Sequence, residues 1–178
     1  MHWLALTLLL RLLDINGVAR DPLHVAPNDK ANVLLLFITN DCPISNSFAH
    51  EMARICADYK SQGVACTLVY VDPTLTDAQV RQHAQEYGHG DYPRIVDRHH
   101  ELVKATGVTT TPEATVIDKS GTIAYRGRID DSIAALGQPR RAVRHPDLRN
   151  ALTQLLTGQP ITTPRTHALG CYISDLAR

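Results

Sequence analysis

A chain of 178 residues is long enough to bury one hydrophobic core, because domains cluster at about 100–150 residues. Its 18 basic and 18 acidic residues cancel, so no overall field attracts nucleic acid or an anionic membrane. We therefore expect a single domain that binds no nucleic acid.

The chain opens on an apolar segment, residues 1–11, in which the run from Trp3 to Leu10 resembles the core of an export signal. No basic region precedes this run, no small-residue cleavage site follows it, and it is too short to span a membrane. Two interpretations stay open: a remnant of an export signal or, as we favour, the first strand or helix of the fold. An exported, periplasmic location and a cytoplasmic one are both compatible with this pattern.

The first predicted strands follow directly. Residues 12–19 contain Asn16-Gly17 between apolar flanks, which is the strongest short-range signal for a β-hairpin. Prolines and polar residues over 22–29 indicate a loop. Residues 33–38 are apolar on both faces and predict a central strand that is buried from both sides.

A long helix is predicted from Pro43 to Gly63, because apolar residues recur at helical spacing and proline suits a first helical turn. We interpret the apolar stripe as a core face; it consists of Ile44, Phe48, Met52, Ile55 and Tyr59. Residues 64–71 predict a second strand. Strand, helix and strand in this order predict a parallel crossover.

Short elements alternate in the second half of the chain. Residues 76–87 and 99–106 predict two helices, which Gly88 and Gly107 end. The first of these has a thin apolar face and is expected at the surface. Residues 113–126 predict an antiparallel hairpin with a turn at its centre.

The last quarter contains one more predicted helix. Residues 130–145 are polar and interrupted by glycine and proline, which indicates a loop, and residues 146–156 predict an amphipathic helix. The pattern predicts one domain over residues 12–157, followed by an extended tail over residues 158–178 that carries Cys171.

Cys42 is the residue that points most directly to chemistry. It follows the strand of residues 33–38 and precedes Pro43, at the start of the predicted helix. Unpaired N–H groups and the positive end of the helix dipole stabilise a thiolate there. The alternative is a buried structural thiol, because cysteine is among the most buried residue types. The polar neighbours favour the reactive interpretation; they are Asn40, Asp41, Ser45 and Asn46.

The remaining cysteines form no recognisable motif. The four cysteines at positions 42, 56, 66 and 171 include no C-x-x-C or C-x-x-C-H pair. This excludes a zinc ribbon and a haem attachment site, and it does not indicate a disulfide scaffold in a chain of this length. We interpret Cys56 and Cys66 as small core residues without a role.

Several linked motifs resemble the thioredoxin-like redoxins, including the thiol-disulfide isomerase-like and alkyl-hydroperoxide-reductase-related branches. They are the Asp-x-Asn-Gly hairpin, a strand ending in Cys-Pro-x-Ser-Asn, the strand opening with Thr111-Pro112-Glu113, the segment 125–131 and the tail with Gly170-Cys171. The resemblance covers residues 12–156 and looks closest to a bacterial group. It implies an α/β thioredoxin-like fold: a central mixed β-sheet flanked by helices, with an N-terminal β-hairpin and a C-terminal extended tail.

The resemblance also implies a site. Cys42 is then the catalytic nucleophile, Pro112 a cis-proline beside it, and Thr111 the residue whose backbone pairs with an extended substrate segment. The candidate substrate-binding residues are Thr39, Ser45, Asn46, Glu113 and Arg126. No cofactor and no metal are expected.

Ser45 departs from the two-cysteine pattern of thioredoxins. Without a thiol at this position, a mixed disulfide at Cys42 cannot be resolved within the motif. Cys171 lies about thirteen residues beyond Gly158, and an extended segment of that length reaches about 40 Å. Three roles for Cys171 stay open: a resolving thiol, a second metal ligand or a buried anchor of the tail.

We favour a thiol-disulfide oxidoreductase that acts on a protein or small-molecule disulfide and is recycled by an unidentified thiol reductant. A peroxiredoxin-like peroxide reductase, with an antioxidant role, is one alternative. Thr39 stands three residues before the thiol as in that family, and Arg126 or Arg128 would polarise the peroxide, but Leu35 stands where the family's motif has proline.

A non-enzymatic copper- or client-binding module is the other alternative, because soft thiolates suit Cu(I). The histidines show no i,i+4 pair on a clear helix, and we interpret most as solvated; they are His83, His89, His99, His100 and His167. Glu113 with the polar segment 126–131 either tunes the thiol or, as we favour, forms a surface ion-pair network.

Overall fold

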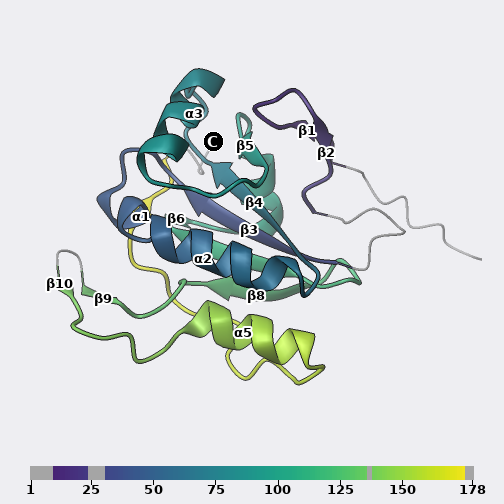
Figure 1. The fold of residues 1–178 in the computed structure, drawn as a ribbon, viewed down its shortest axis with the longest axis vertical. Coiled ribbons are helices and arrows are strands. Elements are labelled where there is room, and N and C mark those ends of the chain that lie inside the picture. Colours follow the sequence, from purple (N-terminus) through teal and green to yellow (C-terminus); the bar gives the residue numbers. More distant parts are fainter. Residues whose placement is uncertain (1–9, 24–30, 136–137, 175–178) are drawn as a thin grey trace, which may run out of the picture.

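A five-stranded mixed sheet forms the centre of the molecule (Figure 1). The computed structural model describes residues 10–23, 31–135 and 138–174. In spatial order the strands are β5 (Arg94–Val96), β4 (Val64–Tyr70), β3 (Asn32–Ile38), β7 (Glu113–Ile117) and β8 (Ile123–Gly127). Strands β3, β4 and β5 run parallel, whereas β7 and β8 are antiparallel to their neighbours. The predicted thioredoxin-like α/β fold with a mixed sheet is confirmed.

Helices cover both faces of this sheet. They are α1 (Pro43–Ser47), α2 (Ala49–Lys60), α3 (Asp77–Glu86), α4 (Glu101–Thr106) and α5 (Asp147–Leu156). Figure 1 shows α2 lying across the sheet with α5 beside it. The predicted parallel crossover is confirmed, since β3 and β4 pair in parallel along their whole length.

The two-sided apolar pattern of β3 explains its central place. Leu34 and Leu36 pack in one cluster with side chains of α2, α3 and α5. Leu35 and Phe37 pack in a second cluster with side chains of α4 and with Ile173 of the tail. Each residue of β3 is buried, and burying a large aliphatic side chain contributes about 1.5–3 kcal/mol.

The long helix predicted after the strand is present with one interruption. Phe48 separates α1 from α2, but its backbone stays close to the right-handed helical region at φ −88° and ψ −4°. Its N–H contacts the carbonyl oxygens of both Ile44 and Ser45, which marks a locally tightened turn. The core stripe continues through the interruption, because Phe48, Met52 and Ile55 are all buried.

The residues predicted to begin and end two helices are confirmed. Thr76 and Gln79 form a reciprocal capping box at the start of α3. Gly107 ends α4 at φ 71°, a left-handed conformation that favours glycine. Helix α3 is less superficial than expected, because Val80 and Ala84 are buried.

Both predicted hairpins are present. Strands β1 (Leu12–Leu13) and β2 (Ala19–Arg20) pair antiparallel. The Asp14 carboxylate accepts hydrogen bonds from the backbone of Asn16 and Val18 inside this turn. The second hairpin is formed by β7 and β8.

Four short strands were not predicted. Strand β5 is an edge strand of three residues, and β9 (Ile133–Ala135) pairs with β10 (Gln138–Pro139) inside the segment expected to be a loop. Strand β11 (Cys171–Tyr172) pairs with the predicted site segment, β6 (Thr110–Thr111). Only tertiary contacts stabilise strands of two or three residues, which is why periodicity missed them.

Four expectations fall on residues that the structure leaves undescribed. They are most of the apolar opening (1–9), part of the first predicted loop (24–29), Gly137 and the end of the predicted tail (175–178). The domain limits at residues 12, 157 and 158 stay predictions. Across the described ranges, no helix combines the length and the apolarity that crossing a bilayer requires.

Candidate redox site

Cys42 lies where β3 gives way to the first helix. It is the N-cap of α1 with an extended backbone, and Pro43 opens the first turn. The residue is 1 % exposed. Its Sγ lies 3.4 Å from the carbonyl oxygen of Thr111. The chain therefore positions this sulfur against the segment that precedes Pro112.

The segment opposite Cys42 contains the other residues singled out by the motifs. The Thr111–Pro112 peptide bond is cis, and Thr111 is fully buried. The hydroxyl of Thr39 lies 3.3 Å from that of Thr111. Two of the proposed site segments, 72 residues apart in the chain, thus meet at the carboxyl end of β3.

The tail completes the site. Cys171 forms a disulfide with Cys42 across 129 residues, with the two Cα atoms 6.2 Å apart, which lies inside the usual range for a disulfide. Strand β11 aligns Cys171 with Thr111 in an antiparallel register. The Ile173 N–H donates to the Thr109 carbonyl at 3.0 Å. Strand pairing, as well as the bond, holds the tail here.

Gly170 permits this close approach. A Cβ on this residue would collide with the Thr111 carbonyl and would lie 3.3 Å from Cδ of Pro112. A larger residue would therefore push the tail away from β6. The glycine that precedes Cys171 is needed for the register in which the two sulfurs meet.

Of the two predicted substrate-binding residues that follow Pro43 in α1, Ser45 is buried and Asn46 is half-buried. Ser45 is 1 % exposed, and its Oγ has no hydrogen-bond partner. The Asn46 amide donates to the Asn40 carbonyl at 2.9 Å. Its Oδ1 accepts from Nε2 of His83 at 2.9 Å. Asn46 thus ties the loop that carries Cys42 to α3.

The interpretation of most histidines as solvated is wrong for three of them. His83, His89 and His100 are 6 %, 7 % and 8 % exposed. Because Asn46 Oδ1 only accepts, Nε2 of His83 carries the proton and the Tyr70 hydroxyl donates to Nδ1 at 2.9 Å. His100 donates to a backbone carbonyl at 2.8 Å.

Burial also determines the charge of this histidine cluster. Desolvation lowers the pKa of His83 and lowers the pKa of His89 to about 4. Both rings are therefore neutral at pH 7. The two rings are polar but uncharged, and the Arg94 guanidinium lies beside His89.

The polar segment near Glu113 is an ion-pair network, but not a surface one. Glu113 is 7 % exposed, and desolvation raises the pKa of its carboxyl group, against the Thr109 N–H and the Arg126 charge. Arg126 Nε lies 3.6 Å from Glu113 Oε1, and its Nη1 donates to the carbonyls of Thr106 and Gly107. These contacts hold the arginine at the end of α4.

The neighbouring charges are paired as well. Arg128 Nε donates to Asp147 Oδ2 at 2.6 Å, and Asp131 accepts two backbone N–H groups and lies 3.5 Å from Arg140. Within the described residues, neither arginine proposed for peroxide, Arg126 or Arg128, forms a hydrogen bond or ion pair with Cys42.

Cys56 and Cys66 occupy the core as predicted, but they are not independent. They form a second disulfide with a Cα–Cα distance of 5.8 Å, and they are 5 % and 9 % exposed. The bond joins α2 to β4, the helix and strand of the crossover. The pairing could have been suspected from that crossover, because its helix packs on its own second strand.

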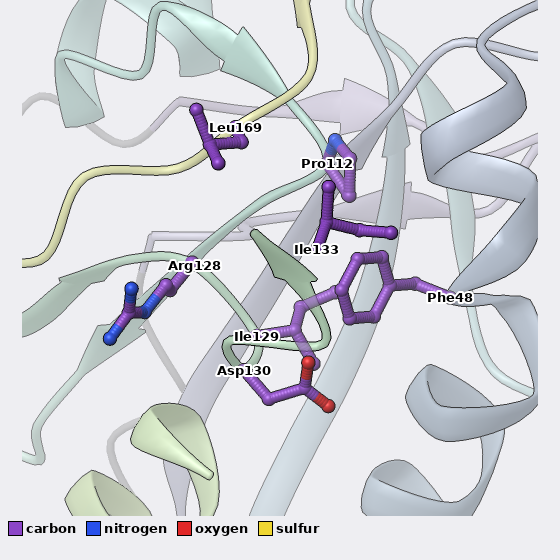
Figure 2. A pocket seen from close by; sticks show the side chains of 7 residues that line it. All are labelled: Phe48, Pro112, Arg128, Ile129, Asp130, Ile133 and Leu169. Atoms are coloured by element: carbon purple, nitrogen blue, oxygen red, sulfur yellow. The ribbon is translucent and has the colours of Figure 1, made fainter. Parts of the chain in front are cut away.

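A shallow pocket lies beside Pro112. Figure 2 shows the ring of Phe48 next to Ile129 and Ile133, with Pro112 above and the Asp130 carboxylate at the rim. The full lining is Phe48, Pro112, Arg128, Ile129, Asp130, Ile133 and Leu169. Within the described ranges, no group of three or more His, Cys, Asp or Glu side chains is arranged to hold a metal ion.

Comparison with known structures places the chain among related folds. A hypothetical protein from Sinorhizobium meliloti is 26 % identical with a TM-score of 0.78, covering 95 % of this chain and 92 % of that one. An uncharacterized conserved protein from Geobacillus kaustophilus is 26 % identical with a TM-score of 0.77, covering 94 % and 89 %.

More distant neighbours share the fold. A secreted disulfide oxidoreductase from Mycobacterium tuberculosis is 15 % identical with a TM-score of 0.59, covering 83 % of this chain and 96 % of that one. No curated protein matches. The Redoxin family model matches residues 23–137, more than half of the sequence. The chain belongs to the redoxin family.

Proposed function

We propose that this redoxin is a thiol-disulfide oxidoreductase in which Cys42 is the nucleophile and Cys171 the resolving thiol. The observation that carries the proposal is the Cys42–Cys171 disulfide, formed where the tail pairs with the strand that leads into Pro112. Substrates are disulfides of proteins or small molecules, and a thiol reductant recycles the protein.

The first step uses the reduced protein. The Cys42 thiolate attacks one sulfur of the substrate disulfide, that S–S bond breaks, and the other substrate sulfur leaves as a thiolate. Its place as the N-cap of α1 supports this role, because first-turn N–H groups of a helix stabilise an anion. The product is a mixed disulfide between Cys42 and the substrate.

The second step closes the protein disulfide. The Cys171 thiolate attacks the Cys42 sulfur and expels the remaining substrate thiolate, so the substrate gains two electrons and the protein loses two. Ser45 cannot perform this step, since it has no sulfur. The tail register that aligns Cys171 with Thr111 supports Cys171 in that role.

The same strand edge serves the substrate. An extended substrate segment would pair with Thr110 and Thr111, as β11 does in the closed form. Tail and substrate then occupy this edge alternately, which couples substrate release to disulfide closure.

The alternatives have less support. A peroxide reductase would need a cation near the thiol, but Arg126 and Arg128 are engaged by backbone carbonyls and by Asp147. A copper module would need Cys171 as a second thiolate, and Cys171 is bonded to Cys42.

Trapping the mixed disulfide tests the proposal. Cys171→Ser, mixed with a peptide disulfide, should stop after the first step and accumulate one peptide on Cys42, as measured by mass spectrometry under non-reducing conditions. Cys42→Ser should accumulate none. Comparable trapping by both variants, or no adduct with Cys171→Ser, would reject Cys42 as the nucleophile.

A further inference from the structure

We propose that electrons enter the oxidised protein through Cys171: a reduced dithiol protein docks on the outer edge of β11 at Tyr172, and its thiolate attacks the Cys171 sulfur. This inference rests on the proposed function. Beyond that function, it identifies which sulfur of the Cys42–Cys171 disulfide the reductant attacks and which surface of this protein the reductant binds.

The two halves of the disulfide differ in accessibility. Cys42 is 1 % exposed, and its sulfur packs against the Thr111 carbonyl. Cys171 is half-buried, on a strand of two residues near the end of the described chain. While the tail is docked, Cys171 is the more accessible of the two residues, so we expect an incoming thiol to attack its sulfur, and Cys42 to become reachable only after the tail has left.

The outer edge of β11 has the polar groups needed for docking. The pairing of Cys171 with Thr111 and the hydrogen bond from Ile173 to Thr109 place the backbone groups of these two tail residues toward β6. In an antiparallel pair the intervening residue, Tyr172, therefore directs its N–H and C=O away from β6. Within the described residues, β11 pairs with no other strand. An extended segment can add there.

Tyr172 also offers a side chain to a partner. It is 84 % exposed, the most exposed large hydrophobic residue described, and it immediately follows the sulfur that is attacked. Its neighbour Ile173 is 7 % exposed in the second core cluster and anchors the tail. Exposed tyrosines are enriched at protein interfaces, where the ring supplies apolar area and the hydroxyl a hydrogen bond. A partner protein, rather than a small thiol alone, fits this surface.

The reaction balances with the dithiol as the two-electron donor. Its first thiolate bonds to Cys171 Sγ while the Cys171–Cys42 bond breaks, and Cys42 leaves as a thiolate at the start of α1. The second thiol of the partner, once deprotonated, attacks the partner's own sulfur in the mixed disulfide and expels the Cys171 thiolate. The partner ends as a disulfide, and Cys42 and Cys171 are both reduced.

Glutathione, a monothiol, tests which sulfur is attacked. Oxidised full-length protein, first mapped to verify the Cys42–Cys171 bond, is exposed briefly to glutathione, quenched with N-ethylmaleimide and digested. We expect glutathione on the Cys171 peptide and maleimide on the Cys42 peptide, at least about tenfold over the reverse pattern. The reverse pattern, an even split or no adduct on Cys171 overturns the proposal. Absence of the bond in the initial map would instead refute the proposed function.

Tyr172→Ser tests the docking surface, with reduced thioredoxin as the dithiol protein and dithiothreitol as the small reductant. The variant should be reduced about tenfold more slowly by thioredoxin and at an unchanged rate by dithiothreitol. Leu13→Ser, which removes another exposed apolar side chain on the N-terminal hairpin, should match the wild type with both. Equal slowing with both reductants, or no slowing with thioredoxin, contradicts the proposed surface.

Discussion

The two disulfides of this chain have the same covalent chemistry in different surroundings. Cys56–Cys66 links two neighbouring core elements ten residues apart, and both residues are at least nine-tenths buried. Cys42–Cys171 links the start of a helix to a tail 129 residues away, beside a cis-proline. The Cys56–Cys66 bond lies in the packed interior between α2 and β4. The Cys42–Cys171 bond joins the start of α1 to the two-stranded pair of β6 and β11.

The difference shows where opening a disulfide can be coupled to a movement. Reducing Cys56–Cys66 would leave α2 and β4 packed, since apolar neighbours such as Met52 and Leu68 surround them. Reducing Cys42–Cys171 would free the end of the tail, which beyond Thr166 is held by a two-residue strand pairing and the burial of Ala168 and Ile173. Thr166 itself stays hydrogen-bonded to the backbone of β8 and of Arg128. The first bond is therefore expected to be structural and the second reactive.

The largest effect should follow loss of the Cys42 thiol. Cys42→Ser should lower turnover of a disulfide substrate by at least about 100-fold, because a hydroxyl does not replace the thiolate nucleophile. Cys56→Ser, the matched change in the other disulfide, should retain most of the wild-type rate. Reduction of insulin in the presence of dithiothreitol measures both, and similar losses in the two variants would remove the distinction between the bonds.

The core disulfide should instead matter for stability. Replacing Cys56 and Cys66 together by alanine should lower the free energy of unfolding by about 2–4 kcal/mol, since the closed loop no longer restricts the unfolded chain. Urea denaturation at fixed protein concentration measures this. If the double alanine variant were as stable as the wild type but slow in turnover, Cys56–Cys66 would be the reactive bond and Cys42–Cys171 the structural one, contrary to our assignment.

The close contact at Gly170 should control closure of the reactive bond. Gly170→Val places side-chain carbons against the Thr111 carbonyl, so the tail should dock poorly and the Cys42–Cys171 bond should form about tenfold more slowly. Alkylation of Cys42 by iodoacetamide in the reduced protein should not slow. Gly158→Val is the control for steric contact, because a Cβ at Gly158 meets no atom within 4 Å. The φ of +72° at Gly158 disfavours valine, so this variant tests the effect of backbone strain without a collision. Wild-type closure in Gly170→Val would disprove the role of the register.

The smallest effect concerns the pH dependence of stability that the buried His89 ring causes. Burial lowers the pKa of His89 to about 4, below its value in the unfolded chain, so the unfolded state binds more protons as pH falls from about 6.5 towards 4. Its contribution to stability is complete above this window and should decrease by about 1 kcal/mol between pH 7 and pH 5.5. Glu113, whose pKa is raised, acts in the opposite direction.

Comparing the pH dependence of unfolding in wild type and His89→Gln isolates this contribution. The variant should lose less stability over the same interval, and the alanine pair at Cys56 and Cys66 should follow the wild-type slope. Identical slopes for His89→Gln and wild type would show that the buried histidine is not the group that titrates.

Much of the fold could be predicted from the sequence because its signals are local. The two-sided apolar run of β3, the capping residue Thr76 and the stop at Gly107 each act through neighbouring residues. The position of Cys42 between strand and helix followed from the same local signals. The short strands β5 and β11 depend on partners distant in the chain, and no periodicity over two or three residues could reveal them.

The sequence singled out the residues of the candidate site but could not give their contacts. Cys171 was within reach of any face, and only the register with Thr111 selects Cys42 as its partner. The Cys56–Cys66 bond could be suspected from the crossover, but only the rotation of α2 over β4, which residue spacing does not give, decides that the two sulfurs meet. His83 looked solvated because α3 has a thin apolar face, yet hydrogen bonds to Tyr70 and Asn46 satisfy it in the interior.

Disulfide mapping across a series of glutathione redox buffers tests the central claim most directly. The fraction of Cys42–Cys171 and Cys56–Cys66 peptides is measured by mass spectrometry after acid quenching, starting from both the oxidised and the reduced protein. The account predicts that Cys42–Cys171 opens and closes reversibly across the series while Cys56–Cys66 stays closed in the protein that began oxidised. Opening of both bonds together, or failure of Cys42–Cys171 to form under any buffer, would contradict it.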